Sequence, residues 1–171
     1  MKGLVQLYTG NGKGKTTSAF GLALRASGHG KKNLIAQFMK GTDYGENISL
    51  KGYKNIDILQ FGWKECIRKD EVREFYKSII EDGLGKCLVV MLEGKYDIVI
   101  LDEIIVSVWF GLVDEKKLIE FIDSKPFTVE LILTGRYASE ALIEKADLVT
   151  EMREVKHPYG KGTQARKGIE F

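Results

Sequence analysis

The chain has 171 residues, of which 44% are hydrophobic and 29% charged, as is usual for a soluble globular protein. This length predicts a single domain over residues 1–171 that buries roughly 70% of the surface of the unfolded chain. The net charge of +2 gives no reason to expect nucleic acid or an anionic membrane as a partner. The two cysteines, Cys66 and Cys87, have neither the spacing of a metal site nor that of a disulfide framework. No apolar run is long enough to span a membrane and the start of the chain leaves no room for a signal peptide, so we expect a cytoplasmic protein.

The first chemically informative stretch follows a short apolar strand expected at residues 4–8. It reads Thr-Gly-Asn-Gly-Lys-Gly-Lys-Thr-Thr over residues 9–17, and an amphipathic helix is expected at 18–27. A strand, a glycine-rich loop and a helix with Gly-Lys-Thr at its entrance are typical of a phosphate-binding loop. Glycines let the loop turn its N–H groups toward an anion, and the helix N-terminus adds further donors. Lys15 would then face the phosphates, and the hydroxyl of Thr16 would ligate Mg²⁺.

The loop departs from the usual spacing. Gly10 and Gly14 are separated by three residues instead of four, and Thr9 stands where the first glycine is expected. A shortened nucleotide loop that holds its phosphates in an unusual register is the favoured interpretation. The alternative is a glycine- and lysine-rich surface turn.

The next elements are a strand at 33–38, a polar loop at 42–55 and a second strand at 56–61. The loop is long enough to be functional instead of a bare connection. Phe61 and Trp63 stand where the second strand ends. They are either core residues or a flat apolar wall for a large planar ligand.

Residues 70–93 carry the longest helical pattern, although Gly83 and Gly85 weaken it and leave open a break into two helices. Its expected apolar face consists of Val72, Phe75, Tyr76, Ile79, Ile80, Cys87, Leu88, Met91 and Leu92.

The second chemical landmark is an aliphatic run, Ile98 to Leu101, that ends in Asp102 and Glu103. A strand that is apolar on both faces is typical of the centre of a parallel sheet covered by helices. Ligands bind at the carboxyl ends of such strands, and carboxylates opposite a phosphate loop hold Mg²⁺ directly or through water.

The remaining chain predicts an apolar segment at 104–112, a helix at 114–123, a strand at 128–134, a helix at 138–145 and a strand at 148–155. The basic, glycine-rich residues 156–171 are either a frayed end or a cationic flap over an anionic ligand. Alternation of strands and helices predicts an α/β fold with a mostly parallel sheet flanked by helices. With the phosphate loop after its first strand, this is a P-loop NTPase (RecA-like) fold.

Several short motifs, taken in order, resemble one family along nearly the whole chain. They are residues 9–17, Arg25–Lys31, Gln37–Gly41, Phe61-Gly-Trp63, Leu101-Asp-Glu103, Thr134-Gly-Arg136, Val155-Lys-His157 and the closing Gly162-x-x-Ala-x-x-Gly-Ile-Glu-Phe171. The sequence is similar in these motifs to the P-loop type of ATP:cob(I)alamin (corrinoid) adenosyltransferase. The shortened loop is the most specific single motif.

This resemblance implies a transferase in which Co(I) of a reduced corrinoid attacks the 5′ carbon of ATP and triphosphate leaves. It implies catalytic roles for Lys15, Thr16 and Glu103, and Mg²⁺ held by Thr16, Glu103 and Asp102. The nucleotide would lie reversed, with its ribose toward the corrinoid. Phe61 and Trp63 would lie beside the corrinoid and favour loss of its lower axial ligand. The implied ligand-binding residues are Thr9, Gly10, Asn11, Gly12, Lys13, Gly14, Lys15, Thr16, Thr17, Arg25, Phe61 and Trp63.

The resemblance also implies a protein that donates electrons for Co(II) reduction, and a homodimer. Members of the family carry a segment before the first strand that covers the active site, whereas only Met1–Gly3 precede that strand here, so we expect no such lid. Two other functions remain open on the residues alone. A small-molecule or nucleotide kinase would use the same loop and release ADP, and a non-catalytic regulator would bind nucleotide without turnover.

Overall fold

The computed structural model describes residues 2–65 and 67–170, and it contains a six-stranded sheet whose strands are all parallel. The strands lie in the order β3-β2-β4-β5-β1-β6. Their bounds are β1 Val5–Thr9, β2 Asn33–Phe38, β3 Ile56–Phe61, β4 Ile98–Asp102, β5 Glu130–Thr134 and β6 Leu148–Glu151. The predicted parallel α/β architecture of the P-loop NTPase type is confirmed.

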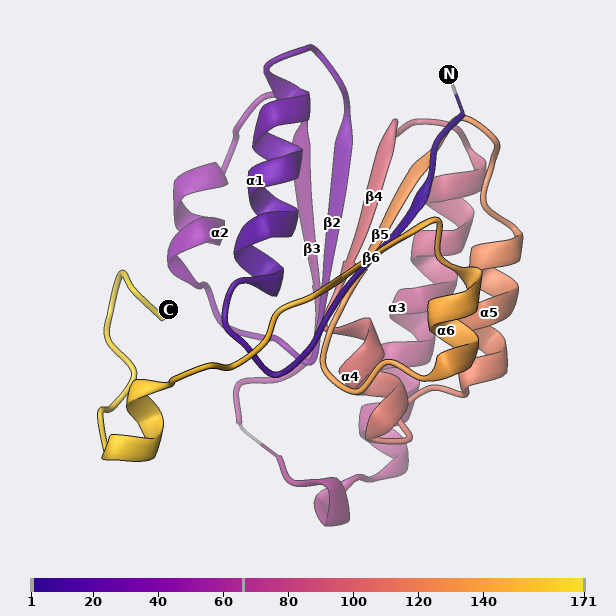
Figure 1. Ribbon diagram of the computed structural model, residues 1–171. Helices are drawn as coiled ribbons and strands as arrows, with labels where there is room; N and C mark the ends of the chain where they lie inside the picture. The colour runs from indigo at the N-terminus through magenta and orange to yellow at the C-terminus, as the bar shows by residue number, and fades with distance from the viewer. Residues whose placement is uncertain (1, 66, 171) are drawn as a thin grey trace.

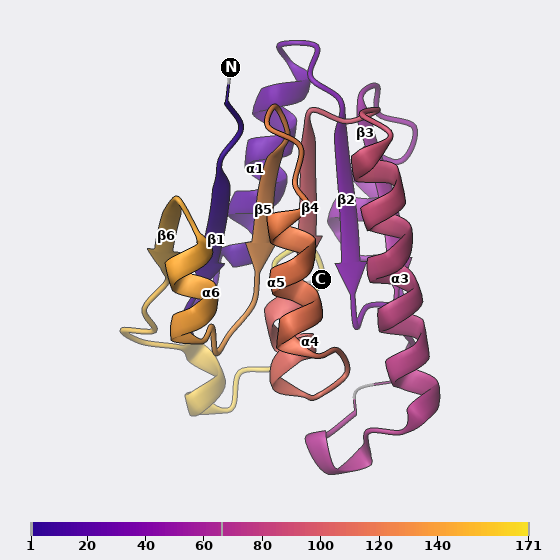
Figure 2. The same ribbon diagram turned by 90° about the vertical axis from the view of Figure 1, so that its right-hand side faces the viewer.

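Helices cover both faces of the sheet (Figures 1 and 2). Helices α1 and α2 lie on one face, and α3, α4, α5 and α6 lie on the other. The α-helices are α1 Lys15–Ser27, α2 Gly45–Leu50, α3 Glu74–Leu92, α4 Ile104–Trp109, α5 Glu115–Asp123 and α6 Glu140–Lys145, and two 3₁₀ helices are η1 Lys69–Glu71 and η2 Pro158–Lys161. None of the helices in residues 2–65 and 67–170 is long and apolar enough to cross a membrane.

Each face of the sheet buries its own hydrophobic cluster, because the strands are apolar on both faces. The α1 side packs Ala19 and Ala23 against Ile35, Ile100 and Ile132. The opposite side is larger and is filled from α3, α4, α5 and α6. Every residue of β4 is buried, and the strand lies between β2 and β5, so its acidic carboxyl end has a neighbouring strand on each side.

The structure corrects several of the sequence-based elements. The strand expected at 148–155 ends at Glu151, and the helix expected at 70–93 begins at Glu74. Residues 45–50, expected to lie in a loop, form α2, which buries none of its residues and therefore has no apolar stripe to reveal it. Helix α3 runs through Gly83 and Gly85 without a break. Two residues assigned to its apolar face, Phe75 and Leu92, are exposed by 66% and 56%.

Gly83 is required by packing. A Cβ at this position would lie 2.5 Å from Cγ of Phe61, so the missing side chain lets α3 lie against the end of β3. Gly83 lowers the helix propensity of α3, but it allows the helix to pack closely against the sheet.

Because all strands are parallel, the carboxyl ends of β1, β2, β4 and β5 meet at one edge. Three of the four non-glycine residues with positive φ in the described chain follow strands at this edge: Met39, Glu103 and Tyr137, at 58°, 63° and 65°. Left-handed backbone is unfavourable for these residue types, and such strain is concentrated at functional sites. We therefore expect the functional site at this edge of the sheet.

Candidate active site

The phosphate loop joins β1 to α1 and folds around its own lysine. Lys15 is only 7% exposed, and its Nζ donates hydrogen bonds of 2.7 Å to the carbonyls of both Gly10 and Gly12. Gly14, the residue before α1, has a φ of 120°, which a residue with a side chain would adopt only under strain. Burial lowers the pKa of Lys15, and the nearby carboxylates of Glu103 and Asp102 oppose that shift. The lysine is positioned at the helix entrance as predicted.

The predicted loop residues divide into two groups. The second half of the loop lines a cavity, with Gly12, Lys13, Gly14, Lys15, Thr16 and Thr17 all on its wall. Thr9, Gly10 and Asn11 are outside this lining. Thr9 is buried and its carbonyl accepts a 2.8 Å bond from the backbone N–H of Met152, while Asn11 is exposed. The Gly12 N–H donates to the carbonyl of Met152 at 2.6 Å, so the chain after β6 lies against the loop.

Asp102, the last residue of β4, connects the phosphate loop to β5 and to the segment after β2. Its carboxylate is completely buried. Oδ1 accepts hydrogen bonds from the hydroxyls of Thr16 at 2.8 Å and Thr134 at 2.7 Å, and Oδ2 accepts from Nζ of Lys40 at 2.8 Å. The pairing with Asp102 raises the pKa of Lys40 against the opposing effect of burial. Asp102 thus fixes the orientation of the Thr16 hydroxyl.

Glu103 is the neighbouring acid and differs from Asp102 in its surroundings. It has left-handed backbone immediately before α4, it lines the cavity, and its N–H donates to the Thr134 hydroxyl at 3.0 Å. Burial, followed by the charge of Asp102, raises the pKa of Glu103. A carboxylate whose ionised form is disfavoured in this way is stabilised by a nearby cation.

The residues present fit a Mg²⁺ site that is completed by phosphate. No cluster of three or more His, Cys, Asp or Glu residues able to hold a metal occurs in the described part of the chain. Mg²⁺, however, is usually held by one or two protein oxygens together with phosphate oxygens and water. Thr16 and Glu103 both line the cavity, and the hydroxyl of the first and the carboxylate of the second would supply such oxygens.

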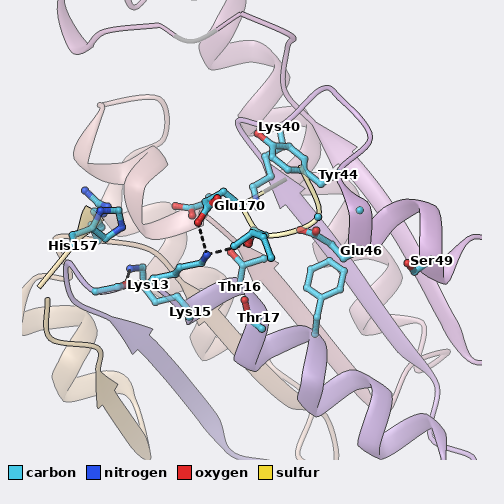
Figure 3. Close-up of a pocket in the computed structure, with 18 residues that line it drawn as sticks. Lys13, Lys15, Thr16, Thr17, Lys40, Tyr44, Glu46, Ser49, His157 and Glu170 are labelled. Atoms are coloured by element: carbon cyan, nitrogen blue, oxygen red, sulfur yellow. Dashed lines mark hydrogen bonds and ion pairs between the residues drawn. The ribbon is translucent and has the colours of Figure 1, made fainter. Parts of the chain in front are cut away.

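The cavity has a volume of about 620 Å³ and extends beyond the loop in two directions (Figure 3). On one side it reaches the segment between β2 and α2, with Lys40 and Tyr44 in its lining, and the first turn of α2, with Glu46. On the other it reaches residues of the C-terminal segment, which we define as residues 156–170. The full lining is Gly12, Lys13, Gly14, Lys15, Thr16, Thr17, Phe20, Lys40, Tyr44, Gly45, Glu46, Ser49, Glu103, Arg136, His157, Gly168, Ile169 and Glu170.

Phe61 and Trp63 lie at the same sheet edge, outside the lining of this cavity. Both are half-buried at the border of the larger hydrophobic cluster. The Phe61 ring lies 5.5 Å from that of Phe38, and the Trp63 ring 4.3 Å from that of Tyr76. Both residues therefore have core contacts and partly exposed surface.

Arg25, predicted to contact the nucleotide, is exposed on α1 and is absent from the cavity lining. Lys40, Tyr44 and Glu170 line the cavity but were not identified as site residues from the sequence. Lys40 belongs to the Gln37–Gly41 motif, which was the only signal for it. The position of the C-terminal segment agrees with a flap beside the cavity instead of a frayed end.

Comparison with known proteins identifies the family. The model of a family described as "ATP:corrinoid adenosyltransferase BtuR/CobO/CobP" matches residues 1–171. A protein from Sinorhizobium sp. named "Corrinoid adenosyltransferase" is 35% identical over 99% of this chain and 81% of its own length. Proteins with that name from Escherichia coli K12 and, as "Corrinoid adenosyltransferase CobA", from Salmonella typhimurium LT2 are each 33% identical over 99% of this chain and 86% of their own. The chain therefore belongs to the ATP:corrinoid adenosyltransferase family of enzymes.

Proposed function

We propose that this protein transfers the 5′-deoxyadenosyl group of ATP to the cobalt of a reduced corrinoid, cob(I)alamin or cob(I)yrinic acid a,c-diamide, and releases triphosphate. The cobalt–carbon bond forms as the bond between the 5′ carbon and its oxygen breaks, and the electron pair of that bond leaves with the triphosphate. The observation that carries the proposal is the 2.8 Å bond from the Thr16 hydroxyl to Asp102. This bond joins the phosphate loop to the acidic end of β4, and Glu103 lines the same cavity as Thr16.

In this reaction the chain's residues bind and orient the two reactants and neutralise the charge of the triphosphate. Backbone from Gly10 to Lys15 would cradle the triphosphate, and Lys15 would exchange its loop carbonyls for phosphate oxygens and stabilise the leaving group. Bound Mg²⁺ would supply further positive charge to the triphosphate, held by Thr16 and Glu103. Asp102, whose oxygens already accept three hydrogen bonds, would act through Thr16. Holding both reactants in place contributes roughly 7–11 kcal/mol to lowering the barrier.

Phe61 and Trp63 would lie against the corrinoid and favour loss of its lower axial ligand, and a separate protein would supply the electrons that reduce Co(II). The ribose of ATP would face the corrinoid, and Arg25 would contact the nucleotide.

We also propose that the protein is a homodimer and that it acts in the cytoplasm.

A kinase is the less favoured alternative. Enzymes that transfer the terminal phosphoryl group surround it with cationic side chains, often including arginine. Among the described residues that line the cavity, Arg136 is the single arginine.

The test is incubation with ATP, Mg²⁺ and chemically reduced cobalamin, followed by the absorbance spectrum before and after illumination. The proposal predicts the light-sensitive spectrum of the adenosylated product. Lys15→Ala should abolish most of it, and Glu103→Gln should reduce it while raising the Mg²⁺ concentration needed. A wild-type protein that binds ATP but gives no light-sensitive product would contradict the proposal.

A further inference from the structure

The C-terminal segment places a carboxylate on the phosphate loop. Glu170 Oε1 accepts a hydrogen bond of 3.0 Å from Nζ of Lys13, and the same Nζ donates to the carbonyl of Ile169, also at 3.0 Å (Figure 3). Lys13 is thereby joined to two residues that follow it by more than 150 positions.

Arg166 binds the same carboxylate. Its backbone N–H donates to Oε2 of Glu170 at 2.8 Å, its Nη2 donates to Oε1 at 3.0 Å, and its Nε donates to Oε2 at 3.3 Å. The hydrogen bonds from Arg166, followed by the one from Lys13, lower the pKa of Glu170 to about 2. The carboxylate is therefore an anion under all ordinary conditions.

The three groups that bind this carboxylate are those that bind phosphate in proteins. An ammonium, the planar fork of a guanidinium and a backbone N–H each donate to tetrahedral oxyanions as readily as to carboxylates. None of the three is specific for a carboxylate.

The position of Glu170 brings it into conflict with a triphosphate. It lines the cavity that also contains Lys15, Thr16 and Glu103. Each of the three lysines in the described lining already has a partner: Lys15 the loop carbonyls, Lys40 the carboxylate of Asp102, and Lys13 that of Glu170. A polyanion entering this cavity meets the Glu170 carboxylate, which already occupies Lys13 and Arg166, and like charges at short range repel each other.

We propose that Lys13 and Arg166 form an anion-binding site beside the phosphate loop, and that a phosphate group of a polyphosphate ligand displaces the Glu170 carboxylate from it. The ligand class, a triphosphate, rests on the proposed function. In the exchange, Lys13, the Arg166 guanidinium and the Arg166 N–H keep an anionic partner, and the cavity loses its fixed negative charge. Glu170 then sets how tightly the cavity holds triphosphate.

The test is calorimetric titration of the full-length protein with inorganic tripolyphosphate, without Mg²⁺ or corrinoid, at physiological ionic strength. Glu170→Gln keeps the shape of the side chain and removes its charge, so it should tighten binding by about two- to fivefold, the range of one exposed charge contact. Arg166→Gln in the Glu170→Gln background should weaken binding by a similar factor, because it removes a cation that binds the phosphate group. The Glu170→Gln background is used because no carboxylate then competes for Lys13. Lys167→Gln is the matched control: it removes the same charge from the adjacent exposed residue and should leave the dissociation constant unchanged.

Unchanged or weaker binding by Glu170→Gln would overturn the proposal, as would an Arg166→Gln change without effect in that background. Absence of tripolyphosphate binding by every variant would overturn it as well. Melting curves without ligand establish that each variant is folded. If the variants behave as expected while adenosyl transfer is absent, the proposed function alone fails; if transfer is normal while Glu170→Gln has no effect, the anion site alone fails.

Discussion

Nζ of Lys40 lies 2.8 Å from Oδ2 of Asp102, an ion pair between residues 62 positions apart in which the aspartate is completely buried. The lysine side chain is 15% exposed. The pair holds the carboxylate that orients Thr16. We therefore expect it to affect both the stability of the protein and the position of the Thr16 hydroxyl at the phosphate loop.

Lys40→Met should therefore destabilise the protein, because it leaves a buried carboxylate with two hydroxyl donors and no cation. We expect a loss of about 3–5 kcal/mol in the free energy of unfolding, measured by urea denaturation at neutral pH. Adding Asp102→Asn should recover much of it. The control is Lys31→Met, which breaks an exposed pair with Asp97 of the same 2.8 Å length and should cost less than about 1 kcal/mol. Equal losses from the two lysine variants would contradict a special role for the buried pair.

The two glycines of α3 should respond oppositely to alanine. Gly83→Ala forces a methyl group against the Phe61 ring and should cost about 1–3 kcal/mol of stability. Gly85→Ala meets nothing within 4 Å and should be neutral or stabilise the helix by up to about 1 kcal/mol. Thermal or urea unfolding of both variants measures the difference. A neutral Gly83→Ala would show that Phe61 does not pack as described.

Phe61→Ala and Trp63→Ala should slow adenosylation more when the reaction begins from Co(II) than when pre-formed Co(I) is supplied. The physical reason is that an apolar wall excludes the corrinoid's lower ligand, and four-coordinate Co(II) is easier to reduce. Both side chains also pack on the core, so stability losses of up to about 3–5 kcal/mol are expected as well. Phe38→Leu, a change at a fully buried neighbour of Phe61, is the control for a purely structural effect and should lower both rates alike. The measurement is the ratio of the adenosylation rate from Co(II) to that from Co(I). An unchanged ratio in Phe61→Ala and Trp63→Ala would show that the two residues act only in core packing.

Cys87 should be inert to alkylation in the folded protein. It is completely buried in α3, and burial raises the pKa of its thiol to about 12. The thiolate that reacts is therefore scarce at pH 8 and shielded from the reagent. Site-resolved mass spectrometry after iodoacetamide treatment should find Cys87 unmodified in native protein and modified after denaturation. Similar labelling rates in both states would contradict the burial.

The sequence allowed most of the fold to be predicted, for identifiable reasons. The bounds of β2 and β3 were predicted to the residue because their hydrophobic runs are bordered by turn residues. Helix α2 was missed because it buries nothing, so hydrophobic periodicity does not mark it. The uninterrupted course of α3 through Gly83 depends on the Phe61 ring, a contact that local pattern does not contain.

The candidate site was predictable where one short motif carries it. Lys15 and Thr16 lie at the helix entrance as expected, and Asp102 and Glu103 lie at the end of the buried strand. The partners Lys40 and Glu170 come from distant segments, and their roles depend on which strands are neighbours and on the path of the chain after β6. Neither relation follows from residue spacing.

The most direct test of the central claim is the fate of ATP. The protein is incubated with Mg²⁺, ATP and excess pre-formed cob(I)alamin, and the phosphate products are separated and counted against the adenosylated corrinoid. Our account predicts one triphosphate for each cobalt–carbon bond formed, with both products lost together in Lys15→Ala. Release of ADP in place of triphosphate would contradict it.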